Sequence, residues 1–195
     1  LSLPASVALI VGSEQIISAL FGYGSFDELS VSNSANALYY FGLGLPAFAL
    51  IKVFSTFFFA NQDTKTPFYI SLISVILNIL ISVYFFREIG FIIIPIATTI
   101  SSWFNAIILF VYLKNKDLFN FNELFFAKLI KIFLASILMG IFFNYLILFF
   151  ENKLIYEYNL KSFYLILSAF LSLILYLSFS LFIKAFKYSD IKLKY

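Results

Sequence analysis

The run from residue 68 to residue 86 constrains the fold of this chain more than any other feature, because it is predominantly apolar and contains no charged side chain. As a helix it is about as long as the roughly 30 Å hydrocarbon core of a bilayer, and it leaves no polar face to meet water. Across the 195 residues, 63% are hydrophobic and only 12% are charged, whereas about a quarter of a soluble domain is charged. The sequence therefore predicts an all-α fold, a polytopic bundle of transmembrane helices.

Similar runs recur along the chain and predict about six membrane spans. We expect them at about residues 1–11, 33–60, 68–86, 91–113, 124–150 and 162–183. The first is about half the length needed to cross the hydrocarbon core, so we expect its helix to begin before residue 1. Gly12 and Ser13 interrupt it, and residues 14–21 alternate polar and apolar side chains, which is typical of a short helix at the membrane interface.

Lysine and arginine are distributed unevenly between alternate loops. If the 61–67 loop is cytoplasmic, nine basic residues lie on that side, three lie on the other, and Lys52 lies inside a span. The cytoplasmic set is Lys65, Lys114, Lys116, Lys128, Lys131, Lys184, Lys187, Lys192 and Lys194, and the other set is Arg87, Lys153 and Lys161. Because an excess of basic residues marks the cytoplasmic side, we expect a cytoplasmic C-terminus.

Several classes of function lack the side chains they need. The chain has no cysteine and no histidine, which removes disulfides, thiol nucleophiles, zinc sites built on those ligands and a serine-histidine-aspartate triad. The net charge of +3 comes from basic residues that stand singly in short loops, rather than in a patch suited to nucleic acid. The acidic residues are scattered as well. We therefore expect no catalytic residue, no metal site and no nucleic-acid partner.

Three stretches resemble one family of membrane transporters. They are LFGYGSF at residues 20–26; YFGLGLPAF at 40–48, which continues through Lys52 to FFANQDTKTP at 58–67; and TTISSWFN at 98–105. Their order is similar to that of the MurJ/MviN-type lipid II flippases of the MOP exporter superfamily. The second stretch is the most specific, and it departs from the family at Phe59, where tyrosine is usual.

The resemblance implies a fourteen-helix transporter with two six-helix lobes followed by two additional helices. Residues 1–113 then correspond to the end of the second lobe, residues 114–195 to the additional helices and a basic cytoplasmic tail, and the N-terminal lobe is missing. The implied activity is flipping of lipid II, the undecaprenyl-linked peptidoglycan precursor, across the bacterial inner membrane by alternating access. The alternatives are a flippase for another polyprenyl-linked oligosaccharide, a MATE-like exporter and, less favoured, a membrane glycosyltransferase or ligase.

Lys52 is the candidate substrate-binding residue. An ammonium inside an apolar span costs about 2.5 to 3.5 kcal/mol on insertion scales and normally faces water or a counter-ion. One interpretation is a cavity cation that attracts the lipid-linked pyrophosphate, which the resemblance favours. The other is a side chain that snorkels to the headgroups, since Asn61 follows nine residues later.

Four polar residues form a second candidate site. Asn78 and Ser82 lie one turn apart on one span, and Thr98 and Ser102 lie one turn apart on the next. Their oxygens would suit a hard cation such as sodium, and we expect either sodium or the membrane potential as the driving force and no other cofactor. The alternative is interhelical hydrogen bonding by small polar side chains.

Two further sets of residues have a dynamic and a static interpretation. The 63–67 loop is either a cytoplasmic gate or the cap of the following helix, with Thr66 or Asp63 as its cap and Pro67 in its first position. A second set in the 33–60 span is either a hinge for alternating access or a static kink. The loop set is Asp63, Thr64, Lys65, Thr66 and Pro67, and the hinge set is Gly42, Gly44 and Pro46.

The resemblance also implies that the last two spans, 124–150 and 162–183, line a groove for the polyprenyl tail of the substrate.

Overall fold

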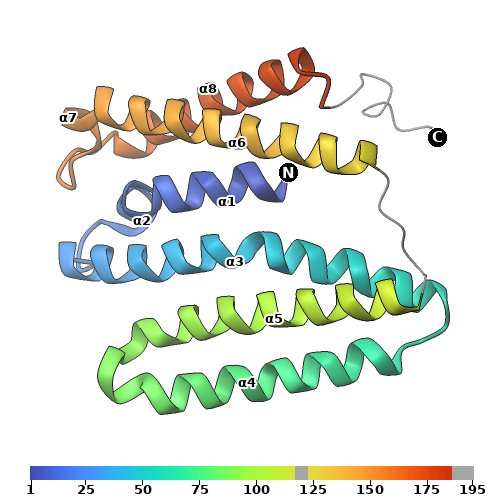
Figure 1. Cartoon of the computed structure of the whole chain (residues 1–195). Coiled ribbons are helices and arrows are strands. Elements are labelled where there is room, and N and C mark those ends of the chain that lie inside the picture. The colour runs from blue at the N-terminus through green and yellow to red at the C-terminus, as the bar shows by residue number, and fades with distance from the viewer. Residues whose placement is uncertain (117–122, 186–195) are drawn as a thin grey trace. The chain divides into compact units, whose positions relative to one another are not determined.

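A computed structural model describes residues 1–116 and 123–185, with side chains described from residue 126 onward in the second range. The elements are α1 Ser2–Val11, α2 Ser13–Phe21, α3 Glu28–Ala60, α4 Lys65–Ile89, the 3-10 turn η1 Gly90–Ile92, α5 Ile93–Asn115, α6 Glu123–Phe149, α7 Glu151–Leu154 and α8 Lys161–Phe182 (Figure 1). These described ranges contain helices and no strand, which confirms the predicted all-α fold. The expected tail lysines Lys187, Lys192 and Lys194 lie outside the described residues.

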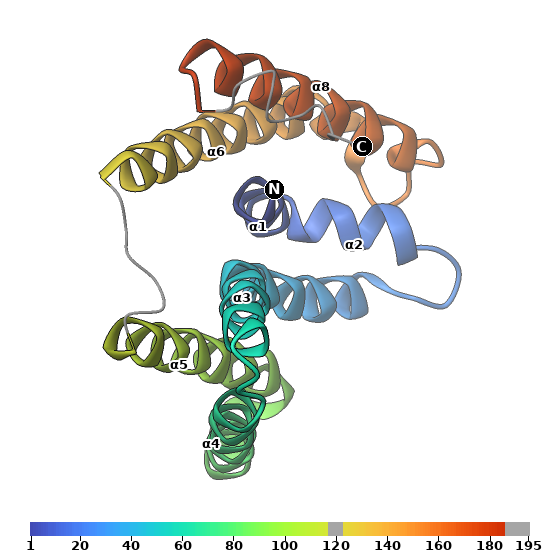
Figure 2. The same ribbon diagram turned by 90° about the vertical axis from the view of Figure 1, so that its right-hand side faces the viewer.

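Four segments are long and apolar enough to cross a membrane, and a fifth is formed if the bent pair of α1 and α2 counts as one span. The longest, Lys65–Asn115, has 51 residues and folds back at η1, so that α4 and α5 lie side by side as an antiparallel hairpin (Figures 1 and 2). The chain bends by 79° between α1 and α2, at the predicted break around Gly12. These segments establish a multi-pass membrane protein.

The helix starts differ from the expected ones because polar side chains cap them. The first full span was expected from about residue 33, but α3 begins at Glu28. The Asp27 carboxylate accepts the backbone N–H of Ser30 at 2.9 Å, which satisfies a donor that has no partner inside the helix. The helix therefore extends back to the residue after Asp27.

The chain packs as two compact units, and α3 passes from one to the other. Unit 1 consists chiefly of α1, α2, the first turns of α3, and α6 to α8; unit 2 consists of residues 36–120. In unit 2, Phe54 and Phe58 of α3 pack against Ile70 of α4 and against Leu109 and Leu113 of α5. The assignment of residues 1–113 to a lobe and 114–195 to additional helices concerns the whole transporter and stays a prediction.

Unit 1 is held together by close contacts between α6, α8 and α1. Helices α6 and α8 lie side by side (Figures 1 and 2). Ser168, Ser172 and Ser180 of α8 are buried, and each hydroxyl donates to a carbonyl within its own helix. Small side chains whose hydroxyl protons are hydrogen-bonded within their own helix let apolar helices approach closely. On α6, a Cβ added at Gly140 would overlap Val7 of α1, so glycine is required there for α1 to pack against α6.

Candidate functional site: a polar cavity in the α4/α5 hairpin and the Asp63 loop

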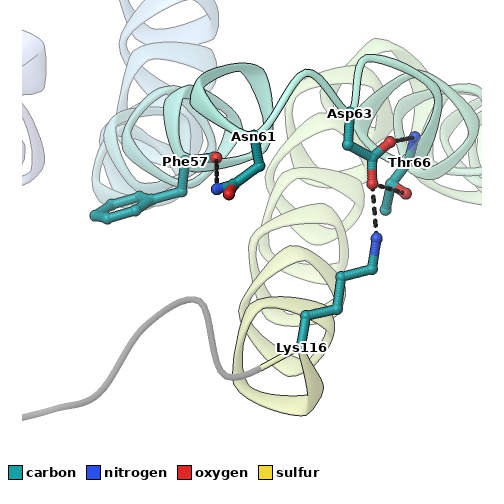
Figure 3. Close-up of polar contacts among 5 residues, drawn as sticks. All are labelled: Phe57, Asn61, Asp63, Thr66 and Lys116. Carbon is teal, nitrogen blue, oxygen red and sulfur yellow. Dashed lines mark hydrogen bonds and ion pairs between the residues drawn. The ribbon is translucent and has the colours of Figure 1, made fainter.

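The Asp63 carboxylate organises the loop between α3 and α4 (Figure 3). Its Oδ1 accepts the backbone N–H of Thr66 at 3.0 Å, and its Oδ2 accepts the Thr66 hydroxyl at 2.8 Å and the Lys116 ammonium at 2.7 Å. The Lys116 contact is the main cause that holds the pKa of Asp63 well below its usual value of 3.8, and the bonds from Thr66 lower it further. Asp63 is therefore an anion with defined partners rather than a freely solvated carboxylate.

The structure corrects the expected start of α4. The helix begins at Lys65 with Thr64 at the N-cap position, so Pro67 is its third residue rather than its first. Asp63, not Thr66, supplies the side-chain cap, because its carboxylate satisfies the Thr66 N–H. Proline is tolerated there because N–H groups in the first turn have no acceptor inside the helix. Thr64 and Lys65 are exposed.

The end of α3 is closed by its backbone. Gln62 has a φ of 58°, in the left-handed region. Its N–H donates to the Phe59 carbonyl at 3.0 Å, and the N–H of Asp63 donates to the Phe58 carbonyl at 3.0 Å. This pair of bonds is a Schellman motif, which satisfies the last carbonyls of a helix. The Asn61 side chain adds a bond to the Phe57 carbonyl at 2.8 Å (Figure 3). The chain therefore reverses here with its backbone donors and acceptors paired.

A cavity of about 370 Å³ is lined by polar side chains of α4 and α5, together with the apolar Val75 of α4 and Phe48 and Ile51 of α3. Asn78 of α4 donates from Nδ2 to the hydroxyls of Thr98 at 3.1 Å and Ser101 at 3.3 Å, both on α5. The Thr98 hydroxyl donates to the Ile94 carbonyl and the Ser101 hydroxyl to the Thr98 carbonyl. Because these protons are used within α5, the two hydroxyls offer lone pairs to their surroundings.

Of the four residues predicted for this site, the structure brings three together. Asn78, Thr98 and Ser102 line the cavity, and the Ser102 hydroxyl donates to the Thr98 carbonyl at 2.6 Å. Ser82 does not line it, and its buried Oγ has no hydrogen-bond partner in the part of the chain that the structure describes.

Sequence reasoning missed Ser71, Ser101 and Asn105, which belong to the same cavity. Asn105 is 6% exposed and donates to the Ser71 hydroxyl at 3.4 Å. Its Oδ1 is buried and accepts no hydrogen bond within the described ranges. Asn105 ends the third family-like stretch of the sequence, a signal that could have indicated it. Ser71 lies two turns before Asn78 on α4, where helical spacing could have indicated it.

Lys52 lies on the exposed side of α3. Its neighbour Phe54 is buried against the hairpin, whereas Lys52 is exposed and forms no ion pair or hydrogen bond within residues 1–116 and 126–185. The ammonium is thus available to a group that this chain does not itself contain.

The proposed hinge region is tied to α5 by side-chain contacts. Thr99 donates to the Tyr40 carbonyl at 2.7 Å, and Trp103 donates from its indole to the Leu43 carbonyl at 3.1 Å. A Cβ at Gly44 would lie 2.9 Å from Thr99 Oγ1, so glycine permits this approach of the helices. Helix α3 continues through Pro46. Whether these residues move during transport stays a prediction.

Lys161 is a feature that sequence reasoning counted only as a loop charge. It is fully buried in unit 1, and its ammonium donates to the carbonyls of Gly22 and Tyr156 at 2.6 Å each. It also lies 4.3 Å and 4.5 Å from the ring centroids of Tyr23 and Tyr156. Two carbonyls and two aromatic faces replace the water around the charge. No sequence signal marked Lys161, since only Tyr156 is near it in the chain and its other partners, Gly22 and Tyr23, lie far away.

Exposed apolar helices of membrane-spanning length, with a cluster of polar side chains between α4 and α5, define a polytopic α-helical membrane protein. The comparisons with known proteins go further: a family model described as lipid II flippase MurJ matches residues 1–170. The chain belongs to the MurJ family, which confirms the resemblance seen in the three stretches.

Individual relatives agree. A probable lipid II flippase MurJ from Rickettsia prowazekii is 36% identical over 139 residues, 71% of this chain and 26% of the relative. Another from Rhizobium meliloti is 42% identical over 113 residues, 58% of this chain and 21% of the relative. A solved structure of a lipid II flippase MurJ in an inward closed conformation matches with a TM-score of 0.74 and 25% identity, covering 97% of this chain and 36% of that one. The chain thus spans about a quarter of the length of these curated relatives.

Proposed function

We propose that the protein to which this chain belongs flips lipid II across the bacterial inner membrane by alternating access, without covalent chemistry. The observation that carries the proposal is the match of 97% of this chain to the inward closed flippase at a TM-score of 0.74. In this proposal the chain supplies the end of the second lobe and the two additional helices, and a preceding lobe completes the cavity.

Lys52 is the residue that we propose to contact the substrate. Its ammonium has no counter-ion among the described residues of the chain, and it stands on a helix whose opposite side is packed. An unpaired cation in an apolar span is costly unless it faces water or an anion. A pyrophosphate linked to a polyprenyl chain is such an anion, with oxygens that accept charge-assisted hydrogen bonds.

Complementation tests this role. In cells depleted of their own flippase, the full-length Lys52→Ala variant should fail to support growth at normal expression, and Lys52→Arg should restore part of it by keeping the charge. Lys128→Ala, which removes an exposed lysine from α6, is the matched control and should grow normally. Wild-type growth of Lys52→Ala would contradict the role of Lys52 in the cavity.

A second proposal is that the α4/α5 cavity binds sodium and so couples flipping to an ion gradient. It is supported by the hydroxyl lone pairs of Thr98 and Ser101 and by the unpaired Oδ1 of Asn105. Oxygen ligands of this kind suit hard cations. Asn78→Ala should weaken the sodium dependence of flipping. If the sodium response is unchanged, the hydrogen bonds of Asn78 serve only to pack α4 against α5.

The groove for the polyprenyl tail is proposed to lie in unit 1. A cavity of about 330 Å³ between α1, α6 and α8 is lined mainly by apolar side chains, among them Pro4, Met139, Phe143 and Leu173. Such a surface matches an isoprenoid chain, which offers no hydrogen bonds. Met139→Trp should fill the cavity and slow flipping of a long-chain substrate more than that of a short-chain analogue. Equal slowing of both would contradict this placement.

We also propose a cytoplasmic C-terminus, which rests on the uneven distribution of basic residues. These 195 residues contain no cysteine. With any cysteine elsewhere in the protein replaced by serine, one cysteine introduced at Lys116 and another at Lys153, in separate variants, can be labelled from either side. An impermeant maleimide added outside should label the residue 153 position and leave the residue 116 position unlabelled. The reverse pattern would invert the proposed topology.

A further inference from the structure

A second polar cavity lies in unit 1, away from the hairpin. It has a volume of about 380 Å³ and lies between the first turns of α2, the first turns of α3 and the segment 154–156. It therefore stands at the start of α3, whereas the Asp63 loop follows the end of the same helix. Since α3 has 33 residues and about 20 span the hydrocarbon core, its first turns can reach headgroup level.

The charge of this cavity is one-sided. Glu14 and Glu28 contribute carboxylates to its lining, and none of the lining residues is basic. Neither carboxylate forms an ion pair or a side-chain hydrogen bond within residues 1–116 and 126–185. Two carboxylates that line the same cavity repel each other and favour a cation between them.

Ser18 provides an independent sign of a ligand. It lines the cavity, is only 7% exposed, and its Oγ is buried without a hydrogen-bond partner in the described part of the chain. A buried hydroxyl without a partner costs free energy, which a bound donor would recover. The cation that fits should thus carry N–H donors as well as charge.

The size and walls of the cavity separate an organic cation from a metal ion. The volume falls in the range of small-molecule sites, about 300 to 1,000 Å³, and Val31, Leu154 and Tyr156 add apolar surface. Among the described residues no group of three carboxylate, histidine or cysteine ligands is placed to hold a metal.

From these contacts we propose that the Glu14/Glu28 cavity is a binding site for a primary ammonium group on a short organic stem. Two sources supply this chemistry: the ethanolamine headgroup of a phospholipid and a soluble amine. The inference concerns a site outside the α4/α5 cavity and does not depend on the flippase proposal.

The test uses full-length protein in phosphatidylcholine nanodiscs, titrated with ethanolamine and followed by calorimetry. Wild-type protein should bind ethanolamine, and tetramethylammonium, which has no N–H, should bind more weakly. Glu14→Gln and Glu28→Gln should each weaken ethanolamine binding by about tenfold, since each removes a charge-assisted hydrogen bond. Glu151→Gln, an exposed acid in α7 that does not line the cavity, is the matched control and should bind like wild type.

A lipid arm identifies the source of the amine. Native mass spectrometry compares retention of phosphatidylethanolamine and phosphatidylcholine by the same variants. Phosphatidylethanolamine retention that depends on both glutamates supports a lipid headgroup, and ethanolamine binding without such retention supports a soluble amine. The proposal is overturned if neither ligand binds, if the glutamine variants bind as wild type does, or if the site prefers calcium to ethanolamine. Because Glu14 and Glu28 are exposed, both variants should keep the wild-type Tm, which checks folding.

Discussion

The carboxylate of Asp63 lies 2.7 Å from the ammonium of Lys116, and this contact joins the loop before α4 to the residue that follows α5. The two ends of the hairpin are therefore fastened to each other as well as packed. The Lys116 ammonium also lies 5.8 Å from the ring centroid of Phe58, which is in the last turn of α3. One lysine thus connects the polar ends of three helices, at the place where the sequence predicted a gate or a cap.

Exchanging the charges of Asp63 and Lys116 distinguishes a gate from a helix cap. Asp63→Lys should lower both the Tm and the flipping activity, because it removes the cap of Thr66 and places two cations together. The double variant Asp63→Lys/Lys116→Asp should regain activity but not the full Tm, since the cap is still absent. Flipping measured in proteoliposomes, with Tm in parallel, checks this. Activity that follows Tm in every variant would argue for a capping role alone.

The pH dependence of the same contact has a defined sign. The pKa of Asp63 is lower in the folded protein than its usual 3.8, so its stabilising contribution is complete well above pH 3.8 and is lost progressively as the pH falls from about 5 towards the lowered pKa. The Tm difference between wild type and Asp63→Asn should stay constant from about pH 7 to about pH 5 and shrink as the pH falls further. A difference that does not change with pH in that acidic range would show that the carboxylate has an ordinary pKa.

Replacing Lys161 should damage the packing of unit 1. Lys161→Met keeps the length and apolar stem of the side chain but leaves the carbonyls of Gly22 and Tyr156 without their donor. Each unsatisfied buried group costs about 1 to 3 kcal/mol, so the free energy of unfolding should fall by about 2 kcal/mol or more. Thermal unfolding of the full-length protein in detergent measures this. Lys153→Met, at an exposed lysine of α7, is the control and should have little effect.

A double-mutant cycle tests the approach of α3 to α5. Gly44→Ala should destabilise by about 1 to 3 kcal/mol, because its methyl group would meet Thr99 Oγ1 at 2.9 Å. Thr99→Ala should cost about 1 kcal/mol through the lost bond to the Tyr40 carbonyl. In the combined variant the clash is removed, so its loss of unfolding free energy should be smaller than the sum of the losses in the two single variants. Strict additivity would show that the glycine is needed for another reason.

Much of the architecture followed from the sequence, because membrane spans are specified by local composition. Long apolar runs predicted the helices, and Gly12 predicted the break between α1 and α2. One-turn spacing indicated a cluster of Asn78, Ser82, Thr98 and Ser102, of which the structure brings together all but Ser82. Helix starts were less accurate. The caps at Asp27 and Asp63 depend on side-chain geometry, and the sequence allowed other residues to take that position.

The sequence by itself determined that this chain is a multi-pass helical membrane protein of the MurJ family, since hydropathy and short motifs are local properties. Only the tertiary structure decided which polar groups share a site. Lys161 meets a carbonyl 139 residues away, and Lys116 meets Asp63 across 53 residues. In apolar surroundings, a polar group is stable only with a partner, and that partner is chosen by how helices pack rather than by neighbours in the chain.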